Sequence, residues 1–200
     1  MIQIKMKINN IGFIARVESY LKEQVTMLFN LIKNMELNEF RDNFNIQIGW
    51  NIFTLRKIEE GFIILAPDYN KNPTIDKTDD LTLALKIHME QMQLLNKLNI
   101  GGDMISFQDK IVCSKGVLNL NDIYLERRDK CDERDSGWFI GAVNNTEESK
   151  ELEAYYAYQI LKIRPCILKV LTLPKEYMVV YDKDNLEAIL NENDIDILKN

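Results

Sequence analysis

The stretch CDERDSGWFIG, residues 131–141, determines how the second half of this chain is expected to fold. Asp135 can accept a hydrogen bond from the backbone N–H two residues further on, and the Ser136-Gly137 step permits a tight turn. Trp138 opens the apolar run that follows, and a tryptophan in a strand usually buries its ring. We therefore predict a turn that delivers Trp138 into a strand.

Arg127 lies upstream of this turn, at the end of a run predicted to form a neighbouring strand. Its guanidinium could pair with Asp135, and a charge-assisted bond of this kind would fix the turn. On this hypothesis the turn itself is structural. Its charged flank, residues 126–135, would be the exposed part that is available to a partner.

Further elements are predicted on both sides of the turn. Short β-rich runs indicate strands at residues 111–113, 123–125, 138–143 and 177–181. Residues 166–173 indicate a short buried element, and the tail from Asp184 to Lys199 a helix.

A longer helix is expected between these strands. The run Asn144-Asn145-Thr146 is suited to cap it, with Glu147 and Glu148 in its first turn. The helix must end near Arg164, because Pro165 disfavours helical geometry in the residue before it. Its apolar face would consist of Leu152, Tyr155, Tyr156, Ile160 and Ile163.

The first half predicts helices around a β-rich centre. Apolar residues at helical spacing favour a helix over residues 13–35. Two β-rich runs between Phe44 and Pro67, separated by a glycine turn, predict a hairpin. After a polar loop, Thr78 is a suitable N-cap for a helix that continues to Leu98. The Gly101-Gly102 pair would end that helix.

The Gly101-Gly102 step is also the predicted domain boundary, because the charge balance changes there and a new strand-rich pattern begins. The predicted fold class is α+β, with two small domains, each a mixed or antiparallel sheet packed with helices. Residues 1–100 would form an N-terminal domain of unknown role. Residues 103–200 would form the domain that carries the Asp-Ser-Gly-Trp motif.

The excess negative charge of the chain lies in its second half. Residues 1–100 carry 12 basic and 12 acidic side chains, whereas residues 101–200 carry 13 basic and 19 acidic ones. Since phosphate contacts require clustered Lys and Arg, this balance disfavours a nucleic-acid partner and favours a basic protein. The sequence contains neither a membrane-length apolar run nor a secretory signal, so we expect a cytoplasmic protein without a membrane partner.

The residue types that carry common chemistry are sparse. His88 is the only histidine, and it shares a helical stripe with apolar residues, which is typical of a core or rim position. Cys113, Cys131 and Cys166 are widely spaced, so neither a disulfide framework nor a zinc site is expected. The chain has no GxGxxG or P-loop motif. We therefore predict no catalytic, metal or cofactor site.

Three segments between Ile111 and Gly141 together resemble a known family: Val112-Cys113-Ser114-Lys115, Tyr124-x-x-Arg127 and Asp135-Ser136-Gly137-Trp138-Phe139. They are similar to the core of a bacterial immunity-protein family of polymorphic toxin systems, group thirty-three, formerly a domain of unknown function. The similarity covers about residues 111–190. It implies a small cytoplasmic protein that binds and neutralises a cognate toxin without catalysis.

The charged flank and the tryptophan supply the predicted contact residues. Trp and Arg are enriched among the residues that dominate protein interfaces, although a strand tryptophan is more often part of the core. The predicted partner-binding residues are Glu126, Arg127, Arg128, Asp132, Glu133, Asp135 and Trp138. The partner would be a toxin of basic character, such as a nuclease.

Two alternatives stay open from the residues alone. One is a small hydrolase or transferase that uses Asp135, Ser136 or His88. The other is a regulatory or scaffold protein with no toxin partner. A polar pocket that joins several of these side chains would favour the enzyme, and a flat or ridged acidic surface would favour a binding protein. The sequence makes no prediction of the oligomeric state.

Overall fold

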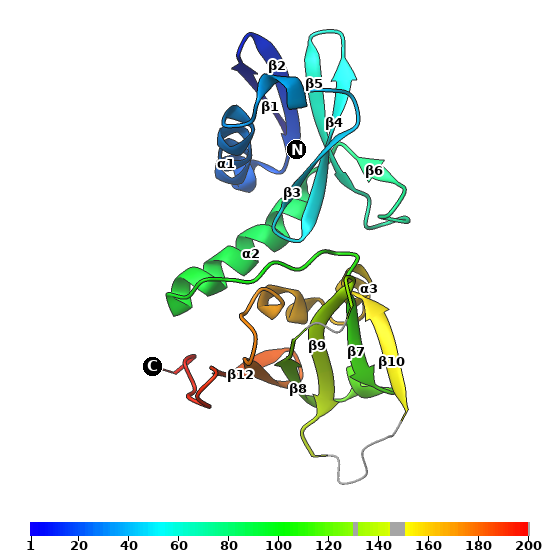
Figure 1. Ribbon diagram of the computed structural model, residues 1–200, viewed down its shortest axis with the longest axis vertical. Helices are drawn as coiled ribbons and strands as arrows, with labels where there is room; N and C mark the ends of the chain where they lie inside the picture. The colour runs from blue at the N-terminus through cyan, green and yellow to red at the C-terminus, as the bar shows by residue number, and fades with distance from the viewer. Residues whose placement is uncertain (130–131, 145–150, 200) are drawn as a thin grey trace. The chain divides into compact units, whose positions relative to one another are not determined.

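The computed structural model describes residues 1–129, 132–144 and 151–199, and it divides into two compact units, Met1–Met89 and Glu90–Asn200 (Figure 1). Each unit contains a mixed sheet of six strands together with helices. The α+β class with two sheet-bearing regions is therefore confirmed. Helix α2, Thr82–Leu98, contains the division between the units, upstream of Gly101-Gly102.

The first unit is a sheet with the strand order β1-β2-β5-β4-β3, to which β6 is added beside β5. Among the pairings of its named strands, only that of β2 with β5 is parallel. Its strands are β1 (Ile2–Ile8), β2 (Ile11–Val17), β3 (Phe44–Ile48), β4 (Asn51–Ile58), β5 (Gly61–Pro67) and β6 (Lys77–Thr78). Its helical elements besides α2 are η1 (Ser19–Leu21), α1 (Lys22–Lys33) and η2 (Leu37–Glu39).

The helix predicted over residues 13–35 is wrong in its first part. Phe13, Ala15 and Val17 alternate as buried residues of β2, which pairs with β1, and α1 begins only at Lys22. The strand period of two therefore overrides the helical spacing that these residues also fit. The predicted hairpin is confirmed as β4–β5, although its first run contains an additional strand, β3.

Helix α2 begins later than predicted. Thr78 belongs to β6 and does not cap the helix; its Oγ1 accepts the backbone N–H of Asp80 at 3.1 Å. The Asp80 carboxylate in turn accepts the N–H of Thr82, the first helical residue, at 3.0 Å. The polar side chains that precede the helix thus form successive turns.

The second unit is a sheet with the strand order β10-β7-β9-β8-β11-β12, and among its described strands only β7 and β9 are parallel. Its strands are β7 (Lys110–Ser114), β8 (Asp122–Arg127), β9 (Asp135–Ala142), β10 (Leu152–Tyr156), β11 (Met178–Asp182) and β12 (Asn185–Leu190). Its further helical elements are η3 (Val117–Asn119), α3 (Ala157–Ile163) and η4 (Pro165–Val170). The four strands predicted here are confirmed as β7, β8, β9 and β11.

Two predicted helices of this unit are wrong. Residues Leu152–Tyr156 form β10, because they pair in register with β7, and only α3 is helical. The expected cap residues 145–148 lie outside the described residues. The tail forms β12, which pairs with β11 and buries Ile189. The end of α3 before Arg164 and the buried segment that includes η4 are confirmed.

One face of the second sheet is packed against α3, η4 and the chain that follows them. Side chains at alternate positions of β8, β9 and β11 point to this face, among them Leu125, Trp138 and Tyr181, each with at most 1% of its surface exposed. The Tyr181 hydroxyl donates to the Cys166 carbonyl at 2.9 Å, which fixes η4 to this face. We call the opposite side of the sheet the open face.

Candidate partner-binding site

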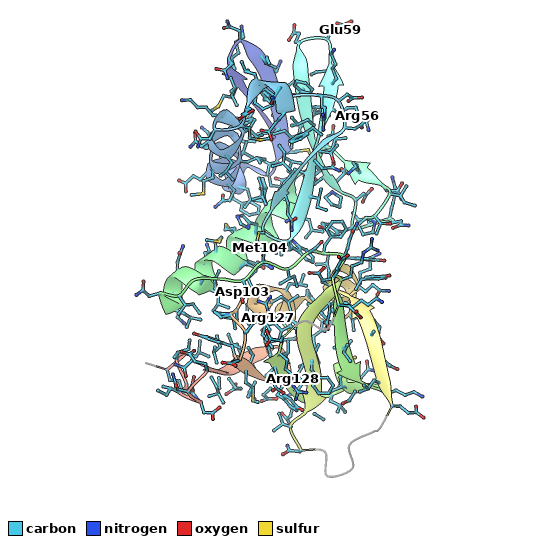
Figure 2. The ribbon with its side chains drawn as sticks, viewed as in Figure 1. Arg56, Glu59, Asp103, Met104, Arg127 and Arg128 are labelled. Carbon is cyan, nitrogen blue, oxygen red and sulfur yellow. The ribbon has the colours of Figure 1, made fainter. Side chains whose placement is uncertain are left out.

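The alternation of β8 divides the predicted contact residues between the two faces of the sheet. Arg127 and Trp138 are register partners on the packed face, with 2% and 1% of their surface exposed. Glu126 and Arg128 flank Arg127 in sequence, so they point to the open face. Figure 2 labels Arg127 and Arg128. Arg127 and Trp138 therefore stabilise the site from the packed face of the sheet. Glu126 and Arg128 belong to its exposed surface.

The Asp-Ser-Gly-Trp turn has the predicted form. The Asp135 carboxylate accepts the N–H of Gly137 at 2.9 Å. The Ser136 hydroxyl donates to the carbonyl of Lys110 at 2.6 Å and accepts the N–H of Trp138 at 3.1 Å. Gly137 has φ = 78°, and a Cβ at this position would lie 2.3 Å from the Arg128 carbonyl oxygen. Glycine is thus required both by the backbone dihedral and by the close approach of the two strands.

Arg127 is held by backbone carbonyls rather than by a carboxylate. Its Nη1 donates to the carbonyls of Asp103 and Leu171, each at 3.4 Å, and to that of Leu173. The predicted Arg127–Asp135 pair is wrong, because these carbonyls occupy the guanidinium and Asp135 binds its own turn. Burial lowers the pKa of Arg127, although Asp103 and Asp109 favour its charged form.

Trp138 completes this buried cluster. Its indole Nε1 donates to the Leu171 carbonyl at 2.9 Å, and the Arg127 guanidinium lies 5.8 Å from the centre of its ring. A cation at this distance from an aromatic ring is attracted to it. The cluster therefore ties β8 and β9 to the segment from Leu171 to Leu173, which crosses the packed face.

The exposed charges near the end of β8 form pairs around a groove. Glu126, Arg127, Arg128 and Asp129 line this groove of about 570 Å³ together with Lys175 and Glu176. Arg128 donates to Glu126 at 2.6 Å, and Lys175 pairs with Asp129. Paired surface charges of this kind contribute little to folding stability, so they are available for recognition at low energetic cost.

The rest of the predicted flank is less well organised. Asp132 and Glu133 are exposed in the connection between β8 and β9, and Asp135 is half-buried at the start of β9. Lys130 and Cys131 of the same connection lie outside the described residues. The structure thus brings Glu126 and Arg128 together, whereas Asp132 and Glu133 do not line the groove.

The candidates for catalysis do not converge on one pocket. Ser136 is fully buried and hydrogen-bonded to backbone, and Asp135 binds its own turn. His88 belongs to the first unit. Its ring packs against Gly49, where an added Cβ would lie 2.6 Å from Nδ1, and burial lowers the pKa of His88. Among the described residues, no group of His, Cys, Asp and Glu side chains could hold a metal ion.

Sequence reasoning missed several residues at this site. Lys175 and Glu176 reach the groove from a distant part of the chain, and Asp103 supplies a carbonyl to Arg127. The alternation Ile123-Tyr124-Leu125-Glu126 does carry a signal, since it separates two core residues from two open-face residues. That signal identifies Tyr124 as a surface residue beside Glu126.

Comparisons with known proteins give one match. The family model described as the Imm33-like domain matches residues 90–192, slightly more than half of the chain and nearly all of the second unit. No curated protein and no solved structure matches the chain. In the described part of the chain, none of the helices is long and apolar enough to cross a membrane.

Proposed function

The chain belongs to the Imm33-like domain family, and from this we propose that it is an immunity protein that binds and neutralises a cognate bacterial toxin without catalysis. The observation that carries the proposal is the extent of the match, residues 90–192, which includes the whole Arg127–Trp138 cluster and the groove above it. A binding role is favoured by a surface that is ordered before the partner arrives. The second unit provides one on a sheet that is packed on its other face.

The charge distribution supports a basic toxin. Residues 101–200 carry 19 acidic and 13 basic side chains, whereas the first 100 residues are balanced. Complementary charge raises the rate at which two proteins meet and suppresses wrong partners. An immunity protein gains from both effects, because it must capture its toxin before the toxin reaches its target. The protein would act in the cytoplasm of the producing cell, with no nucleic acid or membrane as partner.

The buried cluster supports the same proposal through rigidity. Arg127 and Trp138 fix the ends of β8 and β9 from the packed face, so Glu126 and Arg128 project from a backbone that is already ordered. A surface that is ordered before binding loses less conformational entropy when the partner arrives. The cluster would therefore increase affinity without contacting the toxin.

A growth assay tests this function. The product of the adjacent gene, as the candidate toxin, is expressed in a sensitive host alone, with the wild-type protein and with Gly137→Ala, which strains the turn before Trp138. We expect growth only with the wild-type protein, and a complex of the two proteins on a sizing column. Toxicity that is equal with and without the wild-type protein would refute the proposed pairing.

A further inference from the structure

The open face of the second sheet carries an apolar strip that crosses five strands. It consists of half-buried side chains from β7, β8, β9, β11 and β12, which the strand registers align in neighbouring rows. Its members are Val112, Tyr124, Phe139, Met178, Val180, Ala188 and Leu190. On the opposite face, Tyr181 and Trp138 are hydrogen-bonded to η4 and to the segment that follows it. An apolar sheet face that no described helix of its own unit covers is typical of an interaction site.

From this strip and the charges at its ends, we propose that the open face is the docking surface for a basic protein that presents apolar side chains between lysines or arginines. The inference rests on the proposed function, because the toxin is the protein that it assigns to this surface. It differs from the sequence-based prediction in one respect. The contact centre moves from the flank at Asp132 and Glu133 to the middle of the sheet.

Three side chains contact one another in a row at the centre of the open face. The Arg128 guanidinium lies 5.8 Å from the centre of the Phe139 ring, and that ring lies 6.2 Å from the ring of Tyr124. Tyr124 lies directly over Gly141, where an added Cβ would be 2.4 Å from the ring. Tyr and Arg are among the residue types that dominate binding energy at protein interfaces. Their contacts with Phe139 pre-order two such residues in the strip.

An unrelieved like-charge pair marks one end of the same face. Asp122 of β8 and Asp182 of β11 are register partners, and both side chains are exposed. Among the described residues, neither carboxylate forms a hydrogen bond or an ion pair. Only the backbone atoms of Asp122 and Asp182 are hydrogen-bonded. Like charges directly opposite each other on adjacent strands destabilise a sheet. A lysine or arginine from a partner would relieve this repulsion, which gives the surface a preference for a basic protein.

Glu126 lies in the row of the strip that also contains Phe139, and its charge is paired with Arg128 at 2.6 Å. It lies between its register partners Phe139 and Met178, and 30% of its side chain is exposed. A second copy of this chain would bring the same excess of acidic side chains to the contact, 19 against 13 basic ones in residues 101–200. Charge complementarity therefore favours a basic partner over self-association.

Three variants separate the open face from the flank. Asp122→Lys changes the acidic pair, Val180→Glu places a charge within the strip, and Glu133→Lys is the matched charge reversal on the flank. Affinity for the catalytically inactivated product of the adjacent gene is measured by calorimetry, with circular dichroism to check folding. We expect the two open-face variants to weaken binding at least about 30-fold and Glu133→Lys by less than about 3-fold.

Asp122→Lys has a second, independent readout. The substitution replaces a repulsive cross-strand pair with an attraction between the introduced ammonium group and the Asp182 carboxylate. We therefore expect the free protein to melt at a higher temperature while it binds the toxin less well. A side chain with a purely structural role would not separate stability from binding in this way. Weakened binding by Glu133→Lys together with unchanged binding by both open-face variants would overturn the inference.

If the wild-type protein does not bind the adjacent gene product, that result refutes only the proposed pairing of these two proteins. A separate experiment then tests the docking surface. Peptides are selected from a random phage-displayed library on the wild-type protein. We expect the selected sequences to combine Lys or Arg with apolar residues and to lose binding to Asp122→Lys and Val180→Glu. Peptides that are acidic, or that bind all three variants equally, would overturn the inference.

Discussion

Arg127 and Trp138 face each other across β8 and β9, and both donate a hydrogen bond to the carbonyl of Leu171. One backbone oxygen thus joins a buried cation, a buried indole and a segment more than thirty residues further along the chain than Trp138. A guanidinium in the core is costly unless its donors are satisfied. Here the carbonyls of Asp103 and Leu173 satisfy it as well.

Trp138→Ala should destabilise the second unit by about 3–5 kcal/mol, because it removes a fully buried aromatic side chain. Trp138→Phe keeps most of the apolar volume and loses the bond to Leu171, so it should cost only about 1–2 kcal/mol. Urea unfolding followed by far-UV circular dichroism measures both. An unchanged transition for Trp138→Ala would contradict the buried position.

Arg127→Met should destabilise the protein by about 1–3 kcal/mol, because the carbonyls that Arg127 binds would lose a charged donor. Arg128→Met is the matched control. It removes the neighbouring arginine, whose side chain is 65% exposed, and should change stability by less than about 0.5 kcal/mol. Urea unfolding measures both variants. Equal losses of unfolding free energy would contradict the buried position of Arg127 and the exposed position of Arg128.

Gly137→Ala should be far more damaging than Gly141→Ala. At Gly137 the positive φ alone costs about 1–3 kcal/mol for alanine, and the new Cβ would also meet the backbone of Arg128. At Gly141 the obstacle is the Tyr124 ring, a side chain that can move. Thermal unfolding should rank the two variants in this order, and NMR should detect a shifted Tyr124 ring in Gly141→Ala. The reverse order would contradict the turn geometry.

His88 should make stability depend on pH. Burial lowers its pKa below the usual 6.5, so the unfolded chain takes up a proton before the folded one does. The contribution of neutral His88 to the free energy of unfolding is therefore complete above pH 6.5. It is lost as the pH falls through that value towards the pKa of the folded state. Urea unfolding between about pH 7.5 and 5.5 measures this loss, which His88→Gln should reduce. A variant with the same pH slope as the wild type would exclude His88 as the cause.

The sequence contains enough information to predict the turn at Gly137 but not the environment of Arg127. The Asp-Ser-Gly-Trp order predicts both the turn and the buried ring, because the relevant bonds span only two residues. The partners of Arg127 lie 24, 44 and 46 residues away. Only the folded sheet brings those carbonyls together, so a carboxylate close in sequence is the natural but wrong expectation.

Short apolar runs also limit the prediction. Leu152–Tyr156 fits a helical face and a strand equally well over five residues, and pairing with β7 decides between them. For the candidate site, the alternation of β8 separates Glu126 from Arg127 in the sequence itself. The contribution of Lys175 and Glu176 depends on a long-range approach that no local pattern encodes.

The most direct test of the account is a titration of purified toxin activity with purified wild-type protein. A binder that does not catalyse a reaction should inhibit in proportion to its amount and reach full inhibition at about one equivalent, at concentrations well above the dissociation constant. Inactivation of many toxin molecules by each molecule of this protein would mark it as an enzyme. Full toxin activity in the presence of excess protein would contradict the immunity function.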